Sequence, residues 1–469
     1  MNLPVGKSVI SAVTVGMLMS GCAYEAASFK EATASLKSET AATNSSFVAD
    51  HIEGNVSNAW LESFGDETLM TLVDEAQKNN PDLRVSAARV EKAAALMRLS
   101  RSGLYPHLNI RGNFTDFDYT TRDKGYLVGS VAWEPDIWGR LTTLNRADEE
   151  VMKSVAADFA WARQSLAATT AKAWFALNRD KMLYDFMREI VKIQEKALYV
   201  AKEREEIGAG TKRDVHLVTA MAAESKQMLK NFETMQQVDT RSLETLVGRY
   251  PANAIEPKGL TKMPPELPAS GIPADLLNRR PDLVAARYRV AAAFHNEKAT
   301  ELLKLPNITL RFDMGYDHVY DTVAKLIGNL FMPVYDAGRI DALIAAATAD
   351  QKAAIANYRS VVLRAFREVE NALAQEKQLK ERYDFLMTTE REYKTAYDMT
   401  VETYEIGEGT IIDVLTAQSK WIDAGITRVN IANRRLANRV DLHLALGGGF
   451  DARPSWNLDY AKTHASEKK

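Results

Sequence analysis

The sequence predicts a mixed α and β membrane protein built from a duplicated unit. Three observations support this fold class. The decapeptides EIGAGTKRDV and EIGEGTIIDV, at residues 206–215 and 405–414, are identical at seven of ten positions and start 199 residues apart. Two stretches in each half alternate apolar and polar residues, as strands with two different faces do. Proline is absent from residues 136–250 and 334–453, which favours helices far longer than the globular average of about 11 residues.

Composition excludes some partners and cross-links. The chain has 469 residues and a formal net charge of −3, so it lacks the basic field that nucleic-acid binding requires. We therefore expect no nucleic-acid partner. The chain contains one cysteine, which rules out an internal disulfide.

The N-terminus predicts an exported, lipid-anchored chain. An apolar run at residues 9–19 is too short to cross a bilayer, which needs about 20 residues, and it ends in Ser20-Gly21-Cys22. This ending resembles the bacterial lipobox, which implies a signal peptide at residues 1–21 and a covalent lipid on Cys22; we expect no other cofactor. Ala23 then permits export to the outer membrane. A plain signal peptide with an incidental cysteine is the alternative interpretation.

Residues 22–58 are rich in Ala, Ser, Thr and Glu and predict an irregular tether. Two copies of one unit follow. NNPDL at residue 79 corresponds to RRPDL at residue 279, and WGRL at residue 138 corresponds to AGRI at residue 337. The nearly constant offset predicts a duplication, with repeat 1 at residues 59–250 and repeat 2 at residues 274–450. A linker with six prolines at residues 251–273 is expected to cross the outside of the body, and residues 451–469 form a C-terminal tail.

Each copy has the same order of expected elements. A helix comes first, at residues 82–102 and 282–303. A β-hairpin follows, at about residues 106–136 and 306–335. A long helix comes next, in repeat 1 at residues 141–207, which would be about 100 Å long. Such a helix needs a partner along its length, so coiled-coil-like packing is expected before and after the repeated decapeptide.

The strand alternation allows two interpretations, a half-buried sheet in a soluble domain or a transmembrane barrel. Strand lengths of about ten residues, aromatic residues near the strand ends and the lipid signal favour the barrel. Four strands are fewer than the roughly eight of the smallest barrels, and an open edge in lipid leaves backbone groups unpaired. Chains must therefore share strands, and three chains would supply about twelve.

Several segments together resemble the TolC-type outer-membrane factors of tripartite efflux pumps, in particular their OprM-like lipoprotein branch. They are SNAWLESFGDETL, SVAWEPDIWGRL, ADLLNRRPDL, MPVYDAGRI, the two decapeptides and ALGGGF, which span about residues 60–450. The resemblance implies a homotrimer whose 12-stranded barrel in the outer-membrane lipid continues into a long α-helical periplasmic barrel. It also implies a passive exit duct for drugs or other small toxic compounds. A periplasmic adaptor would open the duct, and an inner-membrane transporter of the RND, MFS or ABC type would supply energy.

The repeated decapeptide itself predicts a helical hairpin tip. A phosphate-binding loop would follow a strand and carry Gly-Lys-Ser/Thr, which this sequence lacks. Gly407 suits the left-handed position after a helix and Gly409 completes the turn. Thr410 and Asp413 match a capping box at the start of the next helix. The first copy repeats these signals at Gly208, Gly210, Thr211 and Asp214.

The resemblance assigns roles to these residues. Asp413 would line the periplasmic constriction, Asp214 would restrain the neighbouring hairpin, and Tyr404 would take part in the closed gate. The adaptor would dock at the tip residues Gly208, Gly210, Thr211, Gly407, Gly409 and Thr410.

Two departures from the family pattern concern the gate. Thr416 stands where relatives carry a second acid, and Gly409 stands where a gate arginine falls. Lys212 and Arg213 are candidates for the missing positive charge. The competing interpretation of Asp214 and Asp413 is that they only cap helices.

An enzyme is not expected. The seven histidines are scattered without a metal-binding motif, and neither a nucleophile elbow nor a nucleotide fingerprint is present. The sequence is also compatible with two different functions: a lipid-anchored coiled-coil scaffold without a pore, and a duct serving type I secretion or metal-ion export.

Overall fold

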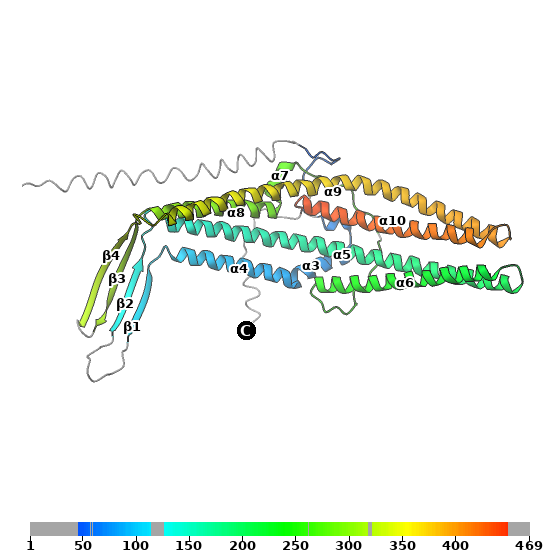
Figure 1. Cartoon of the computed structure of the whole chain (residues 1–469), viewed down its shortest axis with the longest axis horizontal. Coiled ribbons are helices and arrows are strands. Elements are labelled where there is room, and N and C mark those ends of the chain that lie inside the picture. The colour runs from blue at the N-terminus through cyan, green and yellow to red at the C-terminus, as the bar shows by residue number, and fades with distance from the viewer. Residues whose placement is uncertain are drawn as a thin grey trace, which may run out of the picture.

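The computed structural model describes residues 46–56, 58, 60–113, 126–260, 262–317 and 321–448. The molecule is elongated, with a β-sheet at one end and the turns of two helical hairpins at the other (Figure 1). The expected signal peptide, the lipidation site Cys22 and the C-terminal tail lie outside the described residues. Among the described residues, no helix is both long enough and apolar enough to cross a membrane.

The two halves of the chain contain matching elements. The first half contains η1 (Glu62–Phe64), α3 (Glu67–Asn79), α4 (Pro81–Ser102), β1 (His107–Asn113), β2 (Tyr126–Trp133), α5 (Arg140–Glu206) and α6 (Lys212–Leu246). The second contains α7 (Pro273–Arg279), α8 (Pro281–Glu301), η2 (Leu302–Lys304), β3 (Asn307–Asp317), β4 (Asp321–Phe331), α9 (Arg339–Glu405) and α10 (Ile411–Ala445). The long helices α5 and α9 both have 67 residues, and α6 and α10 both have 35. The helices expected at residues 82–102, 141–207 and 282–303 are confirmed.

Local chemistry explains where the short helices begin. Proline occupies the first helical position of α4 and of α8, where the missing N–H would have no partner. The preceding residues, Asn80 and Arg280, occupy equivalent positions and make equivalent contacts. Asn80 Nδ2 donates to the Leu246 carbonyl oxygen at 2.9 Å, and Arg280 Nη1 donates to the Ala445 carbonyl oxygen at 3.3 Å. Each copy thus ties the start of α4 or α8 to the end of its last helix, α6 or α10.

The strand-to-helix junctions also repeat. Gly139 and Gly338 precede α5 and α9 with φ of 74° and 82°, in the left-handed region that favours glycine. The Asp136 carboxylate accepts the N–H groups of Leu141 and Thr142, two of the donors that a helix N-terminus leaves free. Asp336 accepts the N–H of Ile340 in the second copy. Sheet and helices are therefore joined by short, hydrogen-bonded turns.

The sheet has four antiparallel strands in the order β1-β2-β3-β4. The central pairing, β2 with β3, joins the hairpin of one copy to the hairpin of the other, for example through Gly129 opposite Met314. Within the described residues, β1 and β4 are the two unpaired edges. The sheet exposes many large apolar side chains, including Leu108, Ile110, Leu127, Met314, Leu326 and Leu330.

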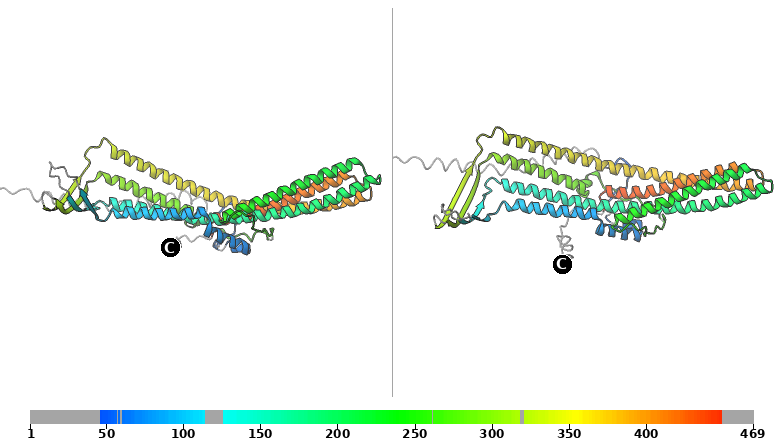
Figure 2. Two further views of the ribbon diagram at one scale, coloured as in Figure 1. Left: turned by 90° about the horizontal axis from the view of Figure 1, so that it is seen from below. Right: turned by 60° about the horizontal axis from the view of Figure 1, so that its bottom comes forward.

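The helical body is a layer in which α5 and α9 run the full length (Figure 2). Near the sheet, α5 packs against α4 and α8, and α8 packs against α9. Toward the hairpin turns, α5 packs against α6 and α10, and α10 packs against α9. The lateral order is therefore α4/α6, α5, α8/α10, α9, and the free edges of the layer are α4/α6 and α9.

The irregular linker between the two copies packs against the helical body. In the linker, the N–H groups of Asn253, Ala254 and Ile255 donate to the Glu244 carboxylate on α6. Further along the linker, Arg439 of α10 donates to the Glu266 carbonyl oxygen at 2.6 Å. The linker thus contacts helices of both copies.

Part of the segment expected to be an irregular tether packs on the helical body. Residues 46–56 pack on the body: Phe47 and Val56 are buried with the core of α8 and α9. The N–H groups of Val48 and Ala49 donate to the Glu370 carboxylate at 2.8 and 3.0 Å. The tether interpretation was therefore wrong for this part. Burial of the two apolar side chains lowers the free energy of the docked segment, and the Glu370 carboxylate accepts hydrogen bonds from its backbone N–H groups.

Candidate gate and docking tips

The two decapeptides form the turns at the end of the molecule opposite the sheet (Figure 1). Helices α5 and α9 end at Glu206 and Glu405 and are followed by the C-cap residues Ile207 and Ile406. The next residues, Gly208 and Gly407, have φ of 78° and 89°. The N–H of Gly409 donates back to the Thr403 carbonyl oxygen at 3.1 Å, as in helix C-caps that end on a left-handed glycine. The prediction of a hairpin tip is confirmed in both copies.

Both outgoing helices begin with a capping box. The Thr410 hydroxyl accepts the Asp413 N–H at 3.3 Å, and Asp413 Oδ2 accepts the Thr410 N–H at 3.2 Å. Thr211 and Asp214 make the same pair of bonds at 3.2 and 3.1 Å. The capping-box prediction is confirmed. Both acids thus have a structural task at the start of a helix.

Sequence reasoning missed one residue that joins the two tips. Arg204, in the last turn of α5, places its guanidinium carbon 4.6 Å from the centroid of the Tyr404 ring on α9. Its Nη1 also donates to the Tyr404 carbonyl oxygen at 2.9 Å. In the sequence, Arg204 lies in the charged run KEREE, which is typical of a solvated helix end. No local signal distinguishes it.

The surroundings of Tyr404 affect its ionisation. Burial raises the pKa of the Tyr404 hydroxyl, the Arg204 charge opposes this rise, and the Asp214 charge adds to it. The net result is a raised pKa, so the phenol is neutral at physiological pH. Tyr404 therefore acts as an uncharged ring against which a cation can pack.

The acidic residues at the tips have different surroundings. Asp413 is exposed, and within the described part of the chain it forms no ion pair. Asp214 is partly buried, and Arg213 Nε lies 3.8 Å from its Oδ1. Residues 402–413 contain four acidic and no basic residues, whereas residues 202–214 contain four of each. The second tip is therefore negative and the first is balanced.

These features coincide with a match to a known family. The family model described as outer membrane efflux protein matches residues 72–249 and 272–448, which together make up most of the chain. The chain belongs to the outer membrane efflux protein family. As a member, it is an outer-membrane component of an efflux pump, and its mixed α and β fold class is confirmed.

Relatives of this efflux protein span nearly its whole length. It is 25% identical over 418 residues to the probable efflux pump outer membrane protein TtgC of Pseudomonas putida, covering 83% of this chain and 85% of TtgC. It is 25% identical over 416 residues to the pyoverdine export outer membrane protein OpmQ of the same species, covering 84% and 88%. The solved outer-membrane channel OprN superposes with a TM-score of 0.79 at 22% identity, covering 87% of this chain and 97% of OprN. The last likeness concerns the fold.

The capping boxes at the tips of this efflux protein can be tested locally. Thr410→Ala removes the hydroxyl that accepts the Asp413 N–H, so we expect a loss of about 0.5–2 kcal/mol in helix stability. Hydrogen exchange of the backbone amides at residues 411–414 should accelerate accordingly. Thr416→Ala is the matched control, because among the described residues that hydroxyl donates only to the Ile412 carbonyl oxygen of its own helix. Equal exchange rates in the two variants would contradict the capping role.

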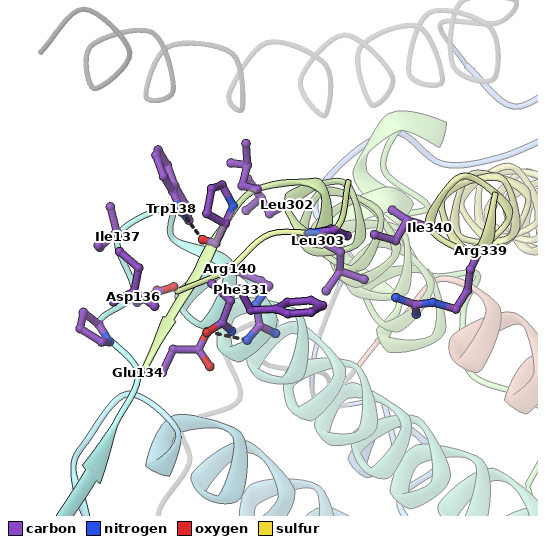
Figure 3. Close-up of a pocket in the computed structure, with 16 residues that line it drawn as sticks. Glu134, Asp136, Ile137, Trp138, Arg140, Leu302, Leu303, Phe331, Arg339 and Ile340 are labelled. Atoms are coloured by element: carbon purple, nitrogen blue, oxygen red, sulfur yellow. Dashed lines mark hydrogen bonds and ion pairs between the residues drawn. The ribbon is translucent and has the colours of Figure 1, made fainter. Parts of the chain in front are cut away.

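A cavity of about 210 Å³ lies where the sheet meets the helices. Figure 3 shows Trp138 and Arg140 beside it, with Leu303 and Phe331 from the second copy. Trp138 Nε1 donates to the Pro306 carbonyl oxygen at 2.7 Å, and Arg140 pairs with Glu134 at 2.7 Å. The Trp138–Pro306 hydrogen bond therefore joins the two copies at the junction, whereas the Arg140–Glu134 pair lies within the first copy.

Proposed function

We propose that this efflux protein is a passive exit duct formed by three copies of the chain in the outer membrane. The observation that carries the proposal is the pair of open strand edges of the sheet, at one end of the molecule (Figure 1). A sheet with free β1 and β4 edges cannot stand alone in lipid, because its backbone groups would lack hydrogen-bond partners. Pairing β4 of one copy with β1 of the next satisfies them. Three copies then supply twelve strands.

The helical body supports the same assembly. Along the free face of α9, Leu363, Phe385 and Met399 are 57%, 72% and 63% exposed, and their spacing places them on one side of the helix. On the opposite edge of the layer, Leu96 and Leu99 of α4 are exposed as well. Apolar stripes of this kind mark interaction surfaces. Packing α9 of one copy against α4 and α6 of the next would bury both.

Anchoring is proposed to involve a lipid on Cys22. This residue lies outside the described part of the chain, and the first described segment, residues 46–56, is already packed on α9. Phe47 lies 25 positions after Cys22, and a fully extended chain of that length spans about 80 Å. The lipid can therefore sit in the membrane while Phe47 stays docked on the periplasmic helices.

The hairpin tips are proposed to form the periplasmic gate and the docking site for an adaptor. An inner-membrane transporter of the RND, MFS or ABC type would supply energy, and the transporter would select the cargo of drugs or other small toxic compounds. Supporting this placement, the tips lie at the end farthest from the sheet and each exposes an isoleucine, Ile207 or Ile406. The duct itself needs no catalytic site.

We propose that three copies of Asp413 form an anionic ring at the constriction, as the resemblance to the TolC-type factors implies. Asp413→Asn removes the charge but keeps an oxygen that can accept the Thr410 N–H. Single-channel recordings should then show a several-fold lower preference for cations, because one charge at about 4 Å in water contributes about 1 kcal/mol.

Asp423→Asn is the control for this ring, since Asp423 is an exposed acid on the same helix but about 15 Å further from the tip. If Asp413→Asn keeps the selectivity of the unmodified channel, Asp413 does not belong to the gate. A protein that does not conduct in planar bilayers would instead support the scaffold without a pore.

A further inference from the structure

We infer that Arg204 is a latch that holds the α9–α10 hairpin against the α5–α6 hairpin within one chain and thereby keeps the periplasmic end closed. The inference rests on the proposed duct. It concerns a residue with no role in the expected gate of Asp413, Tyr404 and Asp214.

The Arg204 guanidinium makes two different contacts with Tyr404. It packs on the face of the Tyr404 ring at 4.6 Å, and its Nη1 donates to the backbone carbonyl oxygen of the same residue at 2.9 Å. Both partners are partly buried, which strengthens a cation–ring contact relative to one in open water. Because one bond goes to the backbone, a change of side chain at Tyr404 alone cannot remove it.

Arg204, a residue of α5, also places a positive charge at the C-terminus of another helix, α9. The last turn of α9, which the structure describes over its whole length, has no basic residue and contains Glu402 and Glu405. A helix C-terminus favours a nearby cation, because its last carbonyl groups carry partial negative charge. Arg204 is the basic residue in the last turn of α5, yet it donates to the end of α9. The second hairpin therefore depends on the first for its capping cation.

The position of the Arg204 side chain leaves one of its own hydrogen-bond donors without a partner among the described residues. Arg204 Nε is buried and, within the described residues, finds no acceptor. A buried donor without a partner is unfavourable. The side chain thus keeps a position that serves Tyr404 rather than one that satisfies all of its own donors.

A latch is needed because the second tip is acidic. Residues 402–413 carry four acidic and no basic residues, so three such tips converging in a closed trimer repel one another. The Arg204 charge and its contacts oppose that repulsion from within each chain. Loss of Arg204 removes both, and the second tips, which carry Asp413, are then free to move apart.

The test compares single-channel recordings of the full-length protein and three variants in planar bilayers. We expect Arg204→Ala to raise the open probability about tenfold, which corresponds to about 1.4 kcal/mol. The open probability of Arg204→Lys should lie between those of Arg204→Ala and the unmodified protein. An ammonium keeps the charge but lacks the planar group that can stack on the ring and donate a hydrogen bond at the same time. Arg188→Ala is the matched control: it removes the same charge from an exposed residue on the same helix, α5, which lies away from the tip and pairs with Asp185 at 3.7 Å. It should behave like the unmodified protein.

A second measurement reads the tips directly. The chain has one cysteine, Cys22, so cysteines introduced at the exposed positions Ile207 and Ile406 give defined sites for spin labels after Cys22 has received its lipid. The distance distribution between the labels should broaden with Arg204→Ala and stay narrow with Arg188→Ala. Unchanged open probability and unchanged label distances in Arg204→Ala would overturn the latch and leave the duct intact. An unmodified protein that does not conduct would overturn the duct, while the label distances still decide whether Arg204 joins the hairpins.

Discussion

Replacing Asp180 with asparagine is expected to stabilise the protein at pH 8 and to have little effect near pH 4. Asp180 lies on α5 with its side chain completely buried. Arg179 donates twice to its Oδ1, at 2.8 and 2.5 Å, while Oδ2 has no partner among the described residues. Burial, reinforced by the neighbouring Asp239 carboxylate on α6, raises the pKa of Asp180 to about 7.

The direction of the pH effect follows from linkage. In the unfolded chain Asp180 titrates near 3.8, so between about pH 4 and pH 7 the folded state binds more protons than the unfolded state. Stability therefore falls as the pH rises through this interval, and the full penalty is present above pH 7. At about 1.4 kcal/mol per pKa unit, the penalty is at most about 4 kcal/mol. Asparagine resembles the protonated form and removes the penalty.

The measurement is the thermal unfolding midpoint of both proteins in detergent across pH 4–8. The two curves should coincide at the acidic end and separate as the pH approaches 8, with the Asp180→Asn protein the more stable. Asp185→Asn is the control, because this acid lies on the same helix, is partly exposed and pairs with Lys181 at 2.5 Å. Parallel curves for Asp180→Asn and the unmodified protein would contradict a protonated Asp180.

Gly315→Ala is expected to prevent the assembled protein from forming. Gly315 in β3 lies opposite Val128 in β2, and a Cβ at this position would lie 2.2 Å from the Leu127 carbonyl oxygen and 2.6 Å from Val128 Cα. Overpacking normally costs about 1–3 kcal/mol. Here both obstructing atoms belong to the backbone of the paired strand, so relief requires β2 and β3 to separate. That pairing joins the two hairpins of the chain, and its loss would split the sheet.

Gly328→Ala provides a control in the next strand, β4. The Cβ added there would lie 3.7 Å from a Leu310 side-chain atom, an ordinary contact. We expect Gly328→Ala to yield normal amounts of heat-stable oligomer in outer-membrane fractions and Gly315→Ala to yield almost none. Similar amounts from the two variants would show that the β2–β3 pairing tolerates the extra methyl group.

Much of the fold follows from local sequence patterns. Residues 405–414 contain a glycine for a left-handed turn and a Thr-x-x-Asp cap, and both appear in the structure as expected. The strands and the 67-residue helices follow from period-two alternation and from long spans without proline. Motif order along the chain identifies the family. The roles of Asp413, Asp214 and Tyr404 in gating stay predictions.

The tertiary structure decided which distant residues meet. Arg204 and Asp180 both lie in charged, helix-forming segments, and in the sequence neither differs from a solvated surface residue. Their partners, Tyr404 and Asp239, come from different helices, 200 and 59 residues further along the chain. Local spacing determines which face of a helix a side chain occupies. Which neighbour covers that face depends on how four helices pack around one another, and this arrangement turns Arg204 into a link between hairpins.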